Sequence, residues 1–198
     1  AIATAKRLGA KVRALDIRPE ANEQVRSIGA EVIPFDIPPE LTKAEGGYAL
    51  RLSKEWYEKE REILTPYVEK SDAVILSALI PGEEAPIIVD EPMVRKMKKG
   101  SVIIDISVDQ GGNCSVTRCG EEYYFNGVYI SGLANIPGTL PVDSSQIFSQ
   151  SVWHFCNHII KDGKFDTNTE DEIIKGTLTT IDKQVVHKGA LLAMGATV

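Results

Sequence analysis

The residue with the clearest chemical potential is Asp16, which directly follows the short apolar segment 12–15. A helix-like pattern over residues 1–9 precedes that segment, so the order predicts a helix and then a strand that ends at the acid. In a dinucleotide-binding βαβ unit, an acid at such a strand end accepts hydrogen bonds from the adenosine ribose hydroxyls and repels a 2′-phosphate. Arg18 could instead attract that phosphate, although the acid is closer to the strand end and favours NAD over NADP. A helix or turn cap fits the spacing of Asp16 equally well.

The glycine-rich phosphate loop that usually accompanies such an acid does not occur in the chain. It should precede a helix about 20 residues before the acid, and residue 1 is only 15 positions before Asp16. We therefore expect this loop to lie upstream of residue 1 in a longer polypeptide.

A second candidate lies in the long non-periodic stretch 36–49, which contains the sequence Gly46-Gly47-Tyr48. Paired glycines allow the backbone to approach a ligand closely, and Tyr48 could cover a bound cofactor. The alternative is a surface loop without a ligand.

Two further candidates follow buried-strand patterns. Residues 77–82, which include Ala78 and Leu79, come after an apolar run, at the position where ligands of doubly wound sheets bind. Asp109 follows the run 101–107 and could orient a substrate or act as acid or base. A plain turn and a solvated loop acid are the respective alternatives.

The composition argues against several other functions. The net charge of −6 disfavours nucleic-acid binding, which needs a basic face. The three cysteines match no zinc spacing, and His154 and His158, one helical turn apart, have no evident third ligand for a metal. The sequence has no run of 18 apolar residues, so no membrane span is predicted.

The elements that would position these residues predict an α/β fold. Helical and strand patterns alternate from residue 1, with Pro19 beginning a helix that Gly29 closes. The runs 72–79 and 101–107 predict strands buried on both faces, as in a parallel sheet. A long helix is expected over 144–161, capped by Asp143 or Ser144, and weak strand signals over 172–186. Pro66 is expected to kink or shorten the helix predicted over 51–70.

Taken together, several segments resemble the alanine dehydrogenase and transhydrogenase family over nearly the whole chain. The most specific are GGYA after a long loop, ALIPG after a buried strand, DISVDQGGN and GLANIPGTLPVDSSQ. The long AEGGYA loop and PGTLPVDSSQ are more similar to the branch that contains the NAD(H)-binding component of proton-translocating transhydrogenase.

The resemblance implies a split architecture with a Rossmann-like, doubly wound and mostly parallel sheet. Residues 1–135 would form the NAD(H)-binding domain without its first strand and phosphate loop. Residues 136–198 would supply a long helix that crosses to a second domain, whose larger part lies upstream and is missing here. The crossing helix would then expose an apolar face.

The resemblance also implies roles for individual residues. The adenosine-ribose segment would be Asp16, Ile17 and Arg18, and the loop that closes over NAD(H) would contain Gly47 and Tyr48. Glu60 matches a cofactor-site position that varies between Glu and Gln, and Leu79, next to Ala78, matches a contact on the nicotinamide side. Asp109 departs from many transhydrogenases and matches an aspartate that acts in substrate chemistry in alanine dehydrogenase.

The function implied is direct hydride transfer between NAD(H) on this chain and NADP(H) on a partner component. In the family a separate membrane component translocates protons, and the NAD(H)-binding component is peripheral to the membrane and dimeric. Two alternatives stay open: an alanine-dehydrogenase-like oxidative deaminase, in which Asp109 would act on the substrate, and a non-catalytic module that binds NADH.

Overall fold

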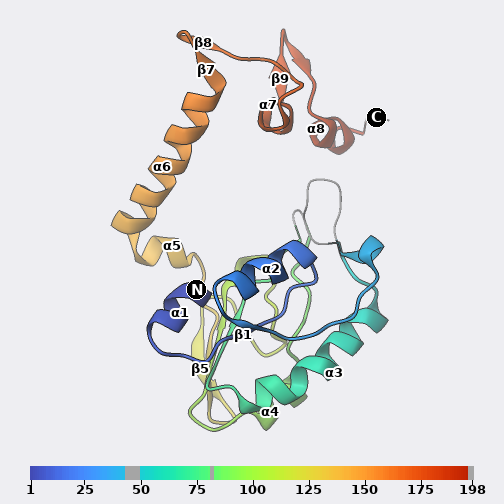
Figure 1. Cartoon of the computed structure of the whole chain (residues 1–198), viewed down its shortest axis with the longest axis vertical. Helices are drawn as coiled ribbons and strands as arrows, with labels where there is room; N and C mark the ends of the chain where they lie inside the picture. The colour runs from blue at the N-terminus through green and yellow to red at the C-terminus, as the bar shows by residue number, and fades with distance from the viewer. Residues whose placement is uncertain (43–49, 81–82, 196–198) are drawn as a thin grey trace. The chain divides into compact units, whose positions relative to one another are not determined.

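The computed structural model describes residues 1–42, 50–80 and 83–195 of the chain. The chain divides into two compact units, Ala1–Ile136 and Pro137–Val198 (Figure 1). Gly47 and Tyr48, which were predicted to cover a cofactor, lie outside the described residues.

The first unit begins with two helix–strand steps. Their elements are α1 (Ile2–Arg7), β1 (Arg13–Ala14), α2 (Pro19–Ser27) and β2 (Glu31–Val32). β1 and β2 pair in parallel. As predicted, α2 starts at Pro19, and Gly29 follows its last turn with a φ of +72°. β2 ends before Pro34, whose missing N–H cannot extend the ladder.

A four-stranded sheet forms the rest of the first unit, in the order β3-β4-β6-β5. Its strands are β3 (Ala73–Leu76), β4 (Val102–Asp105), β5 (Glu122–Phe125) and β6 (Val128–Ser131). β3, β4 and β6 are parallel, and β5 is antiparallel to β6. Asn126 and Gly127 join β5 to β6 with φ values of +50° and +82°, as a tight hairpin turn requires.

Two α-helices and two short 3₁₀ helices connect these strands: η1 (Pro39–Leu41), α3 (Lys54–Lys70), α4 (Glu91–Lys96) and η2 (Ile106–Gln110). α3 and α4 lie side by side (Figure 1). α3 continues through Pro66 to Lys70, so the prediction that this proline shortens the helix is wrong. Leu64 and Val68 of α3 pack into the core with Ile103 and Ile130 of the sheet.

One prediction about the sheet needs correction. The run 72–79 does not form a strand buried on both faces, because β3 is shorter and Ile75 is 48% exposed. Within the described residues β3 pairs only with β4, so its other edge carries no neighbouring strand. The α/β class with a mostly parallel, Rossmann-like sheet is nevertheless confirmed.

The second unit is built around one long helix. Its elements are α5 (Ile136–Thr139, from the boundary), α6 (Pro141–Ile159), β7 (Ile160–Lys161), β8 (Lys164–Phe165), α7 (Glu172–Thr177), β9 (Thr180–Ile181), β10 (Gln184–Val185) and α8 (Lys188–Ala193). Strands β7 and β8 form one hairpin, and β9 and β10 form another.

Two expectations for this unit are wrong. α6 begins at Pro141 rather than Ser144, because the fixed φ of proline suits the first helical position, and no side chain caps it. Residues 172–186 are not simply strand, since Asp171 caps α7 by accepting hydrogen bonds from Ile173 N and Ile174 N at 2.9 and 3.0 Å. The hairpin of β9 and β10 follows that helix.

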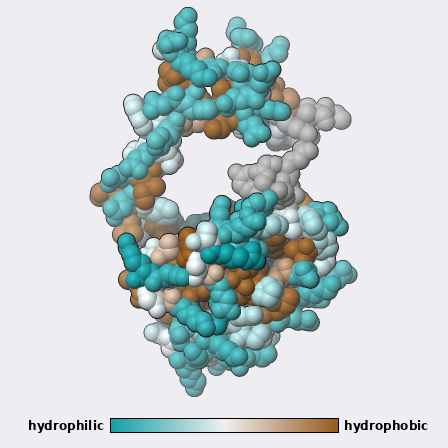
Figure 2. All heavy atoms as spheres, viewed as in Figure 1, coloured by the Kyte–Doolittle hydropathy of each residue, from teal (hydrophilic) through white to brown (hydrophobic). Residues whose placement is uncertain are grey.

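The long helix α6 carries large apolar side chains that the second unit does not cover. None of its residues is buried, and Ile147, Phe148 and Trp153 are 67%, 70% and 64% exposed. Figure 2 shows this hydrophobic surface in brown along the helix. Large apolar side chains exposed along a helix in this way usually mark an interaction surface.

Candidate functional site

Asp16 lies just beyond β1, at the carboxyl end of a parallel strand. Its carboxylate accepts three hydrogen bonds from Arg18: from the backbone N at 2.9 Å, from Nε at 3.0 Å and from Nη2 at 2.8 Å. A carboxylate offers about four acceptor positions, so about one remains for a ligand hydroxyl. The side chain of Asp16 is 30% exposed and can therefore be reached from solvent.

Arg18 is held by this contact as firmly as Asp16. The hydrogen bond to the Asp16 carboxylate is the main cause that raises the pKa of the guanidinium. A 2′-phosphate would have to compete with that carboxylate for the same N–H groups. The geometry therefore weakens the argument that Arg18 favours NADP.

Asn22, in the first turns of α2, supports the acid from its backbone side. Asn22 Nδ2 donates to the carbonyl oxygen of Asp16 at 2.8 Å. Its Oδ1 is buried and has no hydrogen-bond partner in the part of the chain that the structure describes. Sequence reasoning missed Asn22, although an amide one helical turn after a proline helix start is a signal that points back to the preceding loop.

Glu60 of α3 is the second acid of the site. Only 3% of the residue is exposed. Burial raises the pKa of its carboxyl to about 7, Arg61 opposes that effect, and the negative charge of Asp16 adds to it. The charge of Asp16 is thus one cause of the raised pKa of Glu60, a residue to which only the family resemblance pointed. Ile17, between Asp16 and Arg18, is half-buried.

The predicted nicotinamide-side residues lie elsewhere, after the carboxyl end of β3. Leu79 is 41% exposed, whereas Ala78 is partly buried. Both backbone polar atoms of Ala78 are hydrogen-bonded to the side chain of Asn113. No hydrogen bond or ion pair joins this segment to Asp16, Arg18 or Glu60 among the residues that the structure describes, so the two groups form separate halves of the candidate site.

Asp109 is exposed at the end of η2. Its Oδ2 accepts a hydrogen bond from the backbone N of Asn135 at 3.1 Å, and Asn135 has a φ of +50°. The aspartate therefore holds a left-handed turn in place. Its carboxylate keeps free acceptor positions toward solvent, so a substrate could reach it. Burial does not, however, prepare this carboxyl for acid or base chemistry.

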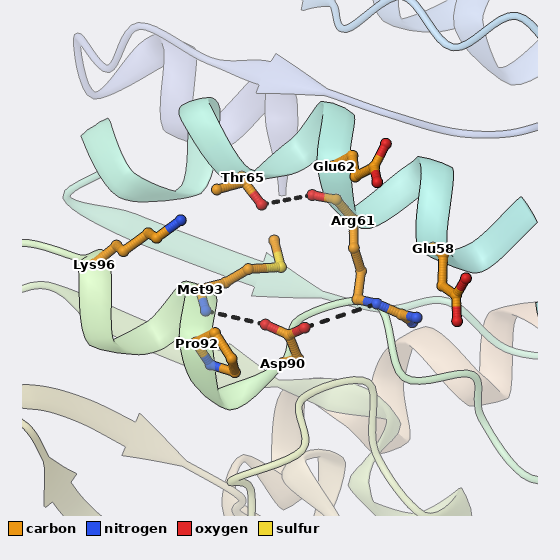
Figure 3. Close-up of a pocket in the computed structure, with 8 residues that line it drawn as sticks. All are labelled: Glu58, Arg61, Glu62, Thr65, Asp90, Pro92, Met93 and Lys96. Carbon is orange, nitrogen blue, oxygen red and sulfur yellow. Dashed lines mark hydrogen bonds and ion pairs between the residues drawn. The ribbon is translucent and has the colours of Figure 1, made fainter. Parts of the chain in front are cut away.

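A groove of about 410 Å³ lies between α3 and α4, lined by Glu58, Arg61, Glu62, Thr65, Asp90, Pro92, Met93 and Lys96 (Figure 3). Arg61 crosses it, donating to the carbonyl of Ile87 at 2.9 Å and lying 3.8 Å from Asp90 Oδ2. Helical spacing places these α3 residues opposite Glu60. The groove therefore belongs to the packing of two helices and not to the carboxylate site.

The described residues contain no group of three His, Cys, Asp or Glu side chains that could hold a metal ion. His158 instead pairs with Asp171, with 2.9 Å between Nε2 and Oδ2. In the ranges that the structure covers, no helix has the length and hydropathy to cross a membrane.

Comparison with known proteins supports the Rossmann-like interpretation of the fold. Residues 1–188 match the family described as "Alanine dehydrogenase/PNT, C-terminal domain". The first part of the NAD(P) transhydrogenase alpha subunit of Rhodospirillum rubrum is 42% identical over 99% of the chain and 52% of the relative. The protein of the same description in Rickettsia prowazekii is 36% identical over 94% of the chain and 48% of the relative.

An alanine dehydrogenase of Staphylococcus haemolyticus is 34% identical, but over only 65% of the chain and 36% of the relative. Among solved structures, a transhydrogenase from Sinorhizobium meliloti superposes with a TM-score of 0.70 at 35% identity, covering 94% of the chain and 48% of that structure. An L-alanine dehydrogenase shares the fold, with a TM-score of 0.64 at 24% identity over 97% of the chain and 48% of that structure.

The chain spans about half the length of the curated relatives that it matches. Among the curated relatives, the transhydrogenase subunit of Rhodospirillum rubrum matches 99% of the chain, whereas the alanine dehydrogenase of Staphylococcus haemolyticus leaves about a third of it unmatched. The chain therefore belongs to the alanine dehydrogenase/PNT family, in the branch of the NAD(P) transhydrogenase alpha subunits.

Proposed function

We propose that this chain is the NAD(H)-binding part of a transhydrogenase, which transfers hydride between NAD(H) and NADP(H) held on a partner component. The observation that carries the proposal is the place of Asp16 just beyond the carboxyl end of β1, where Arg18 leaves about one acceptor position of its carboxylate for a ligand. An acid there suits ribose hydroxyls and repels a 2′-phosphate. The family match and the transhydrogenase relatives support the same interpretation.

The residues present fit the two ends of a dinucleotide. Asp16 keeps about one free acceptor position for a ribose hydroxyl, and Arg18 fixes the orientation of its carboxylate. Leu79 offers an exposed apolar side chain at the carboxyl end of β3, where a nicotinamide ring of a Rossmann-like domain would lie. Ile17 belongs to the adenosine segment, and Gly47 and Tyr48 would close over the cofactor.

Hydride transfer of this kind needs no general acid or base from the protein. The bound nicotinamide supplies a hydride, that is a proton with two electrons, to the second nicotinamide, so that one dinucleotide is oxidised as the other is reduced. The chain's own residues hold and orient the ring, and the loop around Tyr48 would exclude water. No catalytic acid is required, which suits a site whose exposed Asp109 holds a backbone turn.

We further propose that residues 1–135 form a Rossmann domain completed by a strand between β1 and β3. The strand order would then be β2-β1, the additional strand, and β3-β4-β6, which is the common dinucleotide-binding order. Two observations support this: the parallel strands form two separate sheets, and Ile75 of β3 is 48% exposed beside the edge of β3 that no described strand pairs. The phosphate loop would follow that strand.

The rest of the proposal concerns assembly. Residues 136–198 would form part of a second domain, with the exposed apolar face of α6 covered by that domain and by a second copy in a homodimer. The partners would be the NADP(H)-binding and membrane components, and the chain would lie peripheral to the membrane. The relatives' description as alpha subunits supports the existence of further subunits.

The test is a hydride-transfer assay on a chimaera in which the chain replaces the matching 52% of the Rhodospirillum rubrum relative. Mixed with that relative's NADP(H)-binding partner, the chimaera should reduce an NADP⁺ analogue with NADH. Alanine-dependent NAD⁺ reduction by the chimaera would instead favour the alanine-dehydrogenase alternative. Two observations support that alternative: the 34% identity to an alanine dehydrogenase, and Asp109 in the sequence DQGG. NADH binding with neither reaction would favour the non-catalytic module.

A further inference from the structure

Ala78, in the segment that follows β3, is fixed by one side chain at both of its backbone polar atoms. Its N–H donates to Oδ1 of Asn113 at 2.9 Å, and its carbonyl accepts from Nδ2 of the same residue at 2.9 Å. The asparagine therefore pairs with Ala78 as the peptide group of a neighbouring strand would. Ser107 Oγ donates a further hydrogen bond to the Ala78 carbonyl at 3.2 Å.

Asn113 is itself held so that its amide cannot turn away. Nδ2 makes a second hydrogen bond, to the carbonyl of Pro86 at 2.8 Å, and the backbone carbonyl of Asn113 accepts from Ile88 N and Val89 N at 2.8 and 3.0 Å. The residue is completely buried. Since both amide protons and the amide oxygen have partners, a flipped amide would lose all of them.

Asp105, at the end of β4, anchors the asparagine. Its Oδ2 accepts from the backbone N of Asn113 at 2.8 Å and of Cys114 at 3.0 Å, and its Oδ1 accepts from Ser107 N at 3.2 Å. Asp105 is also fully buried. Gly112, with a φ of +83°, lets the chain pass so close to this carboxylate that an added Cβ would lie 2.8 Å from Oδ2.

The hydrogen bonds of Asn113, Asp105 and Ser107 together fix one short segment, at the carboxyl edge of the sheet where the cofactor is proposed to bind. β3 and β4 are neighbours, with Leu76 paired to Asp105. The residues on either side of the clamped Ala78, Ser77 and Leu79, are both exposed. A backbone that is fixed between two exposed residues presents their side chains to a ligand in one constant position.

We propose that Asn113 is a positioning residue for hydride transfer, acting through Ala78 to hold Leu79 against the nicotinamide half of the cofactor, with Asp105 as its anchor and Ser107 as a second support. The inference rests on the proposed function. It predicts that loosening the clamp harms the rate of transfer more than the affinity for NADH, because the adenosine half of the site is separate from it.

The test compares three variants in the chimaera defined above. Asn113→Asp keeps the shape but turns a donor into an oxygen that faces the carbonyls of Ala78 and Pro86. Ser107→Ala is a milder variant that removes one hydrogen bond from the same carbonyl. Val128→Ala is the matched control, because Val128 is fully buried in β6 and its truncation weakens the core without touching the clamp.

Two readouts separate the inference from the function on which it rests. The first, made without ligand, is hydrogen exchange at the Ala78 amide relative to the Ile104 amide of β4. Exchange at Ala78 should speed up on the order of tenfold or more in Asn113→Asp, less in Ser107→Ala and not selectively in Val128→Ala. Unchanged relative exchange in Asn113→Asp overturns the inference, whether or not the protein binds NADH.

The second readout is the split between NADH dissociation constant and transfer rate. Asn113→Asp should lower the rate by on the order of tenfold to a hundredfold, with NADH affinity within about threefold of wild type. Equal losses in Asn113→Asp and Val128→Ala at matched stability would overturn the positioning role. A wild-type chimaera that binds no NADH overturns the proposed function and, with it, the assignment of a ligand to the clamped segment.

Discussion

Asp16 and Glu60 come from different elements, a loop after β1 and the middle of α3, and the charge of Asp16 contributes to the raised pKa of Glu60. Glu60 shares the inward face of α3 with Leu64 and Val68, one and two turns further on, so its carboxyl is drawn into the core edge by their packing. The exposed acid can bind a ligand, and the buried one sets the electrostatic field around it.

Glu60 should make the stability of the first unit depend on pH. Its native pKa of about 7 exceeds its ordinary value of 4.5, so the native state binds more protons than the unfolded chain between those two pH values. The free energy of unfolding therefore falls as pH rises through that window. We expect Glu60→Gln to remove this fall. The free energy of unfolding of Glu60→Gln, measured relative to that of wild type, should therefore rise by on the order of 3 kcal/mol from about pH 4 to about pH 8.

Urea unfolding at several pH values measures this effect. The control is Glu62→Gln, an exposed acid on the opposite side of α3, which should keep the wild-type pH dependence. An identical pH dependence in wild type and Glu60→Gln would show that the Glu60 carboxyl is not the group responsible.

Asp16→Ala should weaken NADH binding by about 1–3 kcal/mol, because it removes a charged acceptor for the ribose. It also frees Arg18 from its two side-chain hydrogen bonds, so NADPH affinity should rise. Calorimetric titration of the chimaera with each nucleotide gives both numbers. Asp72→Ala is the control, since that acid is 91% exposed and pairs with Lys98; unchanged NADH affinity in Asp16→Ala would end the ribose assignment.

Asp109→Asn should leave hydride transfer within about threefold of wild type, because the asparagine oxygen can still accept from Asn135 N and the transfer needs no acid. The rate of NADP⁺-analogue reduction by the chimaera measures this. Asp109→Ala serves as the comparison, since it loses the turn contact as well. Loss of turnover in Asp109→Asn, which keeps the turn contact, would favour the alanine-dehydrogenase branch.

Tyr48→Ala should slow hydride transfer more than it alters folding, because the predicted loop 36–49 would close on the cofactor. Single-turnover transfer rates and thermal midpoints on the same samples make the comparison. Tyr124→Ala, which changes a tyrosine that is 70% exposed on β5, is the control. Parallel losses of rate and stability in Tyr48→Ala would argue against a covering role.

The second unit contains a contact that should respond to acid. Hydrogen bonds from Ile174 N and from His158 lower the pKa of Asp171, which caps α7. A lowered native pKa contributes stability above the ordinary value near 3.8 and loses it as pH falls through the lowered one. Asp171→Asn should reduce this acid sensitivity in thermal unfolding, whereas Asp162→Asn, in the β7–β8 turn, should not; equal curves for all three proteins would exclude the contact.

Local sequence signals predicted much of the first unit. Pro19 and Gly29 mark the two ends of α2, because proline and a left-handed glycine impose backbone geometry without help from the rest of the fold. The place of Asp16 just beyond β1 was predicted from another local signal, an acid directly after a short apolar run.

Contacts between residues far apart in the chain could not be predicted from local sequence patterns. Asn113 lies in a glycine-rich loop, where asparagine usually indicates a turn, and its partner Ala78 is 35 residues earlier in the chain. The apolar run of β3 predicted burial on both faces, yet Ile75 is exposed, since burial depends on a neighbouring strand that no local pattern reveals. Glu60 is likewise buried by packing, and its charged neighbours Lys59, Arg61 and Glu62 indicate a solvated helix.

We propose that Asp16, with Glu60 behind it, selects NAD(H) over NADP(H). Titrating the chimaera with NADH and with NADPH, followed by nicotinamide fluorescence, tests it most directly. We predict tighter binding of NADH by on the order of tenfold or more, as expected when the Asp16 carboxylate faces a 2′-phosphate, and loss of that preference in Asp16→Ala. Equal affinity for both nucleotides, or no binding of either, would contradict the account.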